Sequence, residues 1–144
     1  MFAKGYVDIR ISGIGLDEEA ISKNLGLIPN TFYTKGDTFV DEKYGGTKIE
    51  YEEDCWIVGT ETEFNEAIEH TIDRFLEVLL PSAEYLKDLS RKHNITLWVS
   101  LYPEDEQSNI HISGKTINAL CQIGISLDCS VSFLKDFYNG SYLS

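Results

Sequence analysis

The hydrophobic positions between Thr60 and Pro81 recur at steps of three and four residues, which predicts a helix with one buried face. The stripe consists of Phe64, Ala67, Ile68, Ile72, Phe75, Leu76, Leu79 and Leu80. Thr60 and Glu63 stand at capping-box spacing, and Pro81 cannot continue a helix, so the pattern marks both ends. We expect the rest of the chain to form a sheet and shorter helices around this stripe.

Alternating apolar and polar residues predict half-buried strands over residues 6–12, 95–102 and 125–133. The positions predicted to face inward are Val7, Ile9 and Ile11 in the first stretch, Ile95, Leu97, Val99 and Leu101 in the second, and Ile125, Leu127, Cys129, Val131 and Phe133 in the third. Residues 49–59 read as a further strand, interrupted by Glu52-Glu53-Asp54. Ile110 and Ile112 predict a brief strand with His111 on its other face.

Turn and capping residues divide these elements. Gly45-Gly46 is a signal for a hairpin with a primed turn. Asp17 and Gly26 mark the ends of a short helix, Ser82 can cap another that ends near Asn94, and Gly124 ends a third.

An internal similarity points to the architecture. Residues 8–13 read Asp-Ile-Arg-Ile-Ser-Gly and residues 109–114 read Asn-Ile-His-Ile-Ser-Gly, each before a short helix. Strands with one polar face are typical of a mostly antiparallel sheet with helices on one face. We therefore predict a single α+β domain over residues 1–144, with a ferredoxin-like or split βαβ pseudo-repeat.

Short motifs along nearly the whole chain resemble the bacterial domain-of-unknown-function family 4279. They are Ile11-Ser12-Gly13, Leu16-Asp17, Ile21-Ser22, Leu25-Gly26-Leu27-Ile28-Pro29, Lys35-Gly36-Asp37, Trp56 before the long helix, Ile112-Ser113-Gly114, Ile123-Gly124 and Leu127-Asp128. The chain departs from the family pattern at the last strand, which reads Leu127-Asp128-Cys129-Ser130 where Asp-Ile-Asp and a Tyr are expected. The resemblance implies a fold and a bacterial origin, and it transfers no catalytic residue.

The chain is strongly acidic. The net charge is −12, and residues 49–77 hold ten carboxylates against one base, Arg74. This balance disfavours nucleic acid and anionic membrane surfaces as partners. The carboxylates predicted for the exposed face of the long helix are Glu66, Glu69, Asp73 and Glu77. They form either a solvated face that keeps the protein soluble or a docking surface for a basic partner protein.

Catalytic and cofactor signatures are missing from the sequence. Gly13-Ile-Gly15 begins like a dinucleotide fingerprint, but Glu18 stands where the third glycine belongs. Glu66, His70 and Asp73 share a predicted helix face and could hold a divalent metal, although an exposed polar face with an incidental histidine is the favoured interpretation. We expect no cofactor and no resident metal.

The cysteine pattern and the chain start favour a reducing cytoplasm. The cysteines, Cys55, Cys121 and Cys129, follow no metal or redox spacing, and the apolar contexts of Cys121 and Cys129 predict buried free thiols. Neither a signal peptide nor a stretch long enough to span a membrane is visible.

Two functions remain open at this stage. The first is a small acidic cytosolic binding protein without catalytic activity, such as an immunity or antitoxin-like protein that masks a basic toxin surface. The alternative is a small-molecule or peptide-binding domain that uses the outward face of the sheet around Trp98. That face is predicted to carry Arg10, Trp98, Tyr102, His111 and Asp128. Segment 28–48 or the C-terminal tail is expected to fold over it, because an outward Trp and Tyr are seldom left open.

Overall fold

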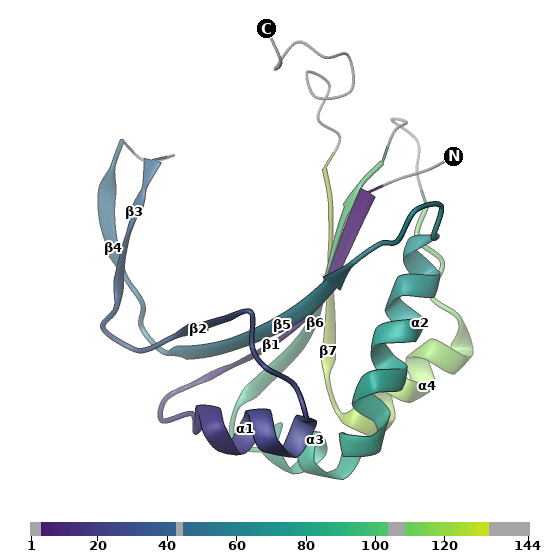
Figure 1. The fold of residues 1–144 in the computed structure, drawn as a ribbon, viewed down its shortest axis with the longest axis horizontal. Coiled ribbons are helices and arrows are strands. Elements are labelled where there is room, and N and C mark those ends of the chain that lie inside the picture. Colours follow the sequence, from purple (N-terminus) through teal and green to yellow (C-terminus); the bar gives the residue numbers. More distant parts are fainter. Residues whose placement is uncertain (1–3, 43–44, 104–108, 133–144) are drawn as a thin grey trace, which may run out of the picture.

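The computed structural model describes residues 4–42, 45–103 and 109–132 and shows a five-stranded sheet in the order β2-β5-β1-β6-β7 (Figure 1). The strands are β1 (Lys4–Gly13), β2 (Thr31–Tyr33), β5 (Asp54–Glu61), β6 (Asn94–Tyr102) and β7 (Ser126–Val131). The central strand β1 pairs antiparallel with β5 and β6, β2 pairs antiparallel with β5, and β7 pairs parallel with β6. The prediction of an α+β fold with a mostly antiparallel sheet is confirmed.

Two split βαβ units build the sheet. Strands β1 and β2 are joined through α1 (Glu18–Leu25) and flank β5, while β5 and β6 are joined through α2 (Ile68–Leu79) and α3 (Ala83–Leu89) and flank β1. A 3-10 turn over Leu80–Ser82 links α2 to α3. This is the predicted ferredoxin-like arrangement, extended by α4 (Gly114–Ile123) and the edge strand β7.

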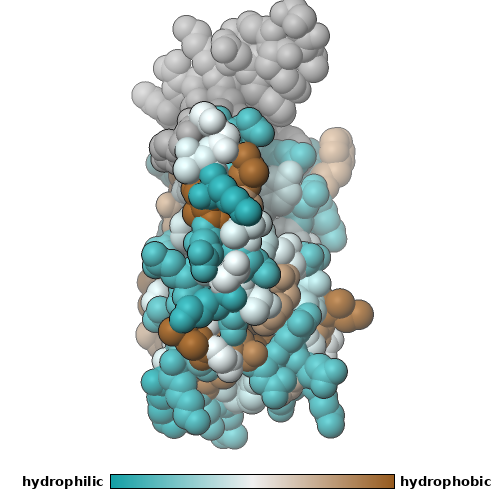
Figure 2. Space-filling model, turned by 90° about the vertical axis from the view of Figure 1, so that its left-hand side faces the viewer, coloured by the Kyte–Doolittle hydropathy of each residue, from teal (hydrophilic) through white to brown (hydrophobic). Residues whose placement is uncertain are grey.

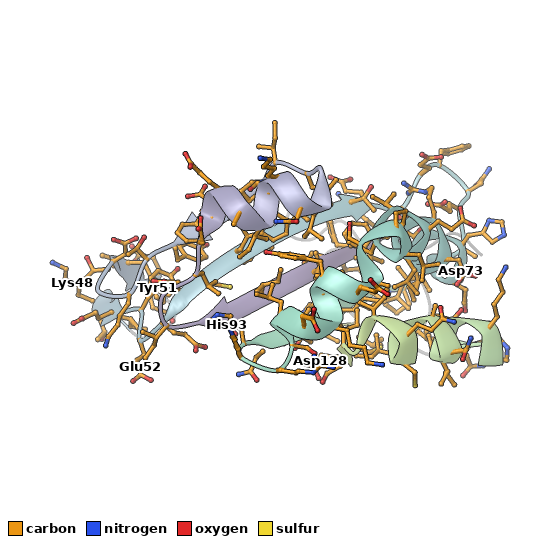
Figure 3. All side chains as sticks on the ribbon, turned by 90° about the horizontal axis from the view of Figure 1, so that it is seen from below. Lys48, Tyr51, Glu52, Asp73, His93 and Asp128 are labelled. Atoms are coloured by element: carbon orange, nitrogen blue, oxygen red, sulfur yellow. The ribbon has the colours of Figure 1, made fainter. Side chains whose placement is uncertain are left out.

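The core lies between the sheet and the helices, which cover one face (Figures 1 and 3). The predicted inward positions of β1 and β6 are buried, as are Trp56 and Val58 of β5. The helices contribute Ile21, Leu25, Ile68, Ile72, Phe75, Leu76, Leu79, Leu86, Leu120 and Ile123. The opposite face of the sheet carries the polar half of each alternating pattern.

A separate hairpin of β3 (Thr38–Asp41) and β4 (Thr47–Glu50) rises from the side of the sheet opposite the helices (Figure 1). Gly45 and Gly46 both have positive φ, 72° and 78°, and the predicted hairpin is confirmed, but the predicted primed turn at Gly45-Gly46 is wrong, because Asp41 pairs with Thr47. Residues 43 and 44 lie outside the described part of the chain. The predicted strand over 49–59 is in fact two strands, β4 and β5, separated at residues 51–53.

The long helix is shorter than the hydrophobic pattern predicts. It begins at Ile68 after Ala67, so the predicted capping box of Thr60 and Glu63 is wrong. Thr60 instead pairs with Val7, because β5 continues to Glu61 along β1. Asn65 then adopts a left-handed φ of 60°, which no helix continues through. Phe64 is 87% exposed and does not belong to the buried stripe.

Two strand predictions near the C-terminus are also corrected. Residues 110–112 are not a strand; they lead into α4, and the similarity between residues 8–13 and 109–114 has no structural counterpart. In β7, Leu127 packs partly against the core, whereas Cys129 and Val131 are exposed, because β7 is an edge strand and only its first part meets the core. Phe133 and the tail lie outside the described residues.

Candidate functional site

A groove of about 680 Å³ lies between the outer face of the sheet and the β3–β4 hairpin. Its floor comes from β1, β5 and β6, and its wall comes from β2 and the hairpin. Figure 2 views the molecule from the hairpin side and shows a mostly hydrophilic surface with small separate hydrophobic patches. The surface therefore offers a ligand-sized hollow instead of a broad apolar interface.

The floor of the groove carries a stacked arginine and tryptophan. Arg10 and Trp98 project from neighbouring strands on the face that the helices leave open, in a register that pairs Asp8 with Trp98 and Arg10 with Thr96. The guanidinium carbon of Arg10 lies 4.4 Å from the centre of the Trp98 ring. Its Nε donates to Asp8 Oδ1 at 2.8 Å. Asp8 therefore offsets the charge of Arg10 and helps to hold it over the indole.

Three aromatic rings join the hairpin to the edge of the sheet. Tyr33 stacks on Tyr51 with ring centres 4.2 Å apart, and Phe39 lies 4.8 Å from Tyr51. Backbone bonds fix this corner, since Gly36 N donates to Tyr51 O and Tyr51 N donates to Asp37 O. Burial, followed by the hydrogen bond with Tyr33, raises the pKa of Tyr51, so its hydroxyl stays protonated near neutral pH.

Carboxylates line the groove close to these rings. Glu50, Glu52 and Glu53 are exposed, and Figure 3 shows Tyr51 and Glu52 together at the hairpin end of the molecule. Asp54 next to them points elsewhere and is buried. Among the described residues, the charged side chains that line the groove are these three carboxylates and Arg10, which is paired with Asp8.

Asp54 holds the two turns at the base of the groove. Its carboxylate accepts backbone N–H groups from Gly15 and Leu16 at 3.0 Å each and from Lys35 at 2.8 Å. The bond from Lys35 is the largest cause of the lowered pKa of Asp54. Because Lys35 lies just before the hairpin, this buried carboxylate positions the hairpin relative to the sheet.

The structure brings together only part of the predicted ligand face. Arg10 and Trp98 line the groove, and Asp128 pairs with Trp98 in the neighbouring strand β7. Tyr102 lies at the far end of β6, where its ring makes an edge contact with Tyr6 at 6.2 Å. His111 is not on the sheet, since it precedes α4 and its backbone N–H donates to Glu69 of α2.

The sequence interpretation missed the hairpin half of the groove. Tyr33, Phe39, Tyr51 and Cys55 line it together with the predicted residues. The tyrosines lie in the irregular segment before β5, and only the Gly45-Gly46 turn signal showed that this segment forms an element of its own. Segment 28–48 or the C-terminal tail was expected to fold over this face; the hairpin of that segment lines one wall of the groove and leaves it open, and the tail lies outside the described residues.

The predicted acidic helix face does not form a continuous patch. Glu66 precedes α2, and only 11% of its side chain is exposed. Its carboxylate accepts Arg74 Nη2 at 2.9 Å and Nε at 3.1 Å, Thr71 Oγ1 at 2.7 Å and Glu63 N at 3.0 Å. The hydrogen bond from Arg74 is the main cause of a pKa lowered to about 2. Glu66 therefore belongs to the fold of the β5–α2 connection.

Two further carboxylates of this set fasten α2 to the segment around α4. Glu69 Oε1 accepts the His111 N–H at 3.0 Å, and Asp73 Oδ1 accepts Thr116 Oγ1 at 2.6 Å. Glu77 is exposed near the end of α2. Figure 3 shows Asp73 at the end of the molecule opposite Tyr51 and Glu52, so the helix set and the groove are separate surfaces.

The Glu66, His70 and Asp73 trio does not share a helix face, because Glu66 lies outside α2. Within residues 4–42, 45–103 and 109–132, no group of three His, Cys, Asp or Glu side chains is placed to hold a metal ion. The same described ranges contain no helix that is both long enough and apolar enough to cross a membrane.

Comparison with known proteins places the chain in a family. No curated protein and no solved structure matches it. A family model described as Domain of unknown function (DUF4279) matches residues 3–134. Since this match covers most of the chain, the protein belongs to the DUF4279 family.

Proposed function

We propose that this chain is a binding protein that holds a small molecule or a short peptide in the groove between the sheet and the hairpin. The observation that carries the proposal is the convergence of aromatic side chains from separate segments on one hollow: Trp98 from β6, Tyr33 from β2, and Phe39 and Tyr51 from the hairpin arm. A hollow of about 680 Å³ is in the range that small-molecule sites occupy.

The proposed activity is binding without catalysis. Two titratable groups in the groove have shifted pKa values, Tyr51 and Cys55, and in both cases burial raises the pKa. Raised values keep the hydroxyl and the thiol protonated and make them poor nucleophiles at neutral pH. The bacterial cytoplasm is the proposed location, because the free thiols suit a reducing compartment.

A basic protein partner, such as a toxin masked by an immunity-type protein, is the second candidate. The net charge of −12 and the exposed Glu50, Glu52 and Glu53 favour it, whereas Glu66, Glu69 and Asp73 are engaged within the fold. Its test is affinity for products of neighbouring genes at two salt concentrations. Binding that does not weaken with salt would contradict it.

Tryptophan fluorescence tests the groove directly, because the two tryptophans occupy different places. Trp98 lines the groove, whereas Trp56 is fully buried and its indole N–H donates to Ser22 Oγ at 3.1 Å. We expect some members of a panel of cationic, anionic and neutral metabolites and short peptides to change the emission of the wild type. The change should disappear in Trp98→Phe, in which Trp56 serves as an internal reference.

A silent panel would contradict the proposal. The same holds for a response of unchanged size in Trp98→Phe, which would place the ligand elsewhere. Trp98→Phe keeps an aromatic ring beside Arg10, and an unchanged denaturation midpoint would show that the variant is folded.

A further inference from the structure

We infer that the ligand of the groove is a small organic cation, in which an alkylammonium group is presented to the aromatic rings. The inference rests on the proposed function and adds the chemical class of the ligand. It is drawn from the balance of charge around the groove and from the kind of surface that faces it.

Asp8 offsets the positive charge of Arg10, which lines the groove. Asp8 lies 2.8 Å from its Nε, and the side chains are 39% exposed in Arg10 and 18% exposed in Asp8, so the two residues form a close pair in which Arg10 still meets solvent. The guanidinium also stacks on Trp98, which fills one of its faces. An anion entering the groove would share the guanidinium with Asp8, which accepts from its Nε.

The remaining charges of the groove are negative. Glu50, Glu52 and Glu53 line it and are exposed. A basic cluster of Arg91, Lys92 and His93 lines an adjoining hollow of about 440 Å³, which shares only Ser12 and Glu53 with the groove. A cation at the hairpin end therefore meets Glu50, Glu52 and Glu53, whereas Lys48 of β4 lies at the same end of the molecule without lining the groove.

A site for an organic cation needs aromatic rings as well as negative charge, and the groove has both. Tyr51 stacks on Tyr33 at 4.2 Å and meets Phe39 in a tilted contact at 4.8 Å, and all three rings line the groove with Trp98. Aromatic rings near a cation attract it through their negative faces, and alkylammonium groups also bury their methyl groups against such rings. Carboxylates alone would select any cation, whereas this combination selects an organic one.

The experiment compares three probes of nearly the same shape: choline, the neutral isostere 3,3-dimethylbutan-1-ol and the anion 3,3-dimethylbutanoate. Binding is followed by NMR titration of the Trp98 indole N–H, with Trp98→Phe used to assign the signal. We expect choline to bind about tenfold more tightly than the alcohol, and the anion to bind most weakly.

A matched pair of triple variants separates local from general charge. E50Q/E52Q/E53Q removes the carboxylates of the groove, and E19Q/E77Q/E84Q removes the same charge from exposed helix positions. We expect the first variant to weaken choline binding about tenfold and to leave the alcohol unaffected. The second should leave the binding of both probes within about twofold of the wild type.

Each other outcome overturns the inference. Equal affinity for choline and the alcohol would show a groove that holds ligands without selecting charge, so the proposed function would survive. Tighter binding of the anion would show that the groove binds carboxylate ligands, with Arg10 as the group that holds them. If choline does not bind, the cation assignment falls, whereas the proposed function falls only if the wider fluorescence panel is silent as well.

Discussion

Arg74 of α2 donates two hydrogen bonds to the Glu66 carboxylate, from Nη2 to Oε1 at 2.9 Å and from Nε to Oε2 at 3.1 Å. The same carboxylate also accepts hydrogen bonds from the Glu63 backbone N–H and from the hydroxyl of the buried Thr71. Glu66 belongs to the acidic run in the sequence, but in the structure its carboxylate holds the β5–α2 connection to α2 through hydrogen bonds. Net charge and charge available to a partner are different quantities in this protein.

The first prediction concerns Glu66 and pH. Its folded pKa of about 2 lies below the ordinary value of 4.5, so the ionised carboxylate stabilises the fold fully above pH 4.5. This contribution is lost as the pH falls from 4.5 towards 2. We expect Glu66→Gln to lower the free energy of unfolding at pH 7 by about 2 kcal/mol in urea titrations. The difference from the wild type should shrink at pH 2.

Glu77→Gln is the matched control for this prediction, because it removes the same charge from an exposed position of the same region. Its effect on the free energy of unfolding should stay within about 0.5 kcal/mol. Equal effects of the two substitutions, or a Glu66→Gln effect that persists unchanged at pH 2, would contradict the role assigned to the Arg74 pair.

The hydrophobic pattern predicts the core of this fold well, for a physical reason. Val7, Ile9 and Ile11 alternate because β1 is the central strand and buries a full row of side chains against the helices. The same pattern fails in β7, where Cys129 alternates correctly but is exposed. Alternation shows which face of the sheet a residue is on. Burial also requires a layer of helices over that face, and these helices cover less of an edge strand than of a central one.

The sheet side of the candidate site could be predicted from the sequence, and the hairpin side could not. Arg10 and Trp98 follow from strand alternation, because outward positions on paired strands share a face. Tyr33 and Tyr51 could not be paired in advance, since their stacking depends on backbone bonds between residues 36–37 and Tyr51 that no periodicity encodes. His111 was misplaced because a short apolar alternation also suits a coil that packs Ile110 and Ile112 on the core.

The second prediction concerns Asp54, whose carboxylate accepts three backbone N–H groups at the base of the groove. Asp54→Ala leaves these donors without their acceptor and should lower the free energy of unfolding by about 3 kcal/mol, measured in urea. Glu53→Ala, at the exposed neighbouring position, should change it by less than about 0.5 kcal/mol. A similar effect of the two changes would refute the anchoring role of Asp54.

The third prediction concerns the close packing of β5 against β1 at Gly59. A Cβ at this position would lie 2.5 Å from Asp8 Cβ and 2.6 Å from Val7 O, so the backbone must move to accept alanine. Gly59→Ala should lower the free energy of unfolding by about 2 kcal/mol. Gly114→Ala is the control, because a Cβ there meets nothing within 4 Å and alanine favours the helix. A thermal midpoint for Gly59→Ala at or above that of Gly114→Ala would contradict the packing argument.

The last prediction uses Cys55, which lines the groove and is half-buried, while Cys121 and Cys129 are exposed. Burial raises the pKa of the Cys55 thiol and leaves less thiolate at pH 8. Iodoacetamide should therefore modify Cys55 about tenfold more slowly than Cys121, as followed by peptide mass spectrometry. The rate at Cys55 should rise further as the pH is raised above 8, because the thiolate fraction continues to grow.

A variant that combines Cys121→Ser and Cys129→Ser leaves Cys55 as the reacting thiol and turns this reaction into a report on the groove. A ligand that lies on the floor beside Trp98 should slow alkylation of Cys55 in proportion to its occupancy, whereas urea should abolish the protection. If Cys55 reacts as fast as Cys121 in the native protein, the hairpin does not shield the floor. Full protection of Cys55 that is retained in Trp98→Phe would show that the ligand shields the thiol without depending on Trp98, and would contradict its placement beside that ring.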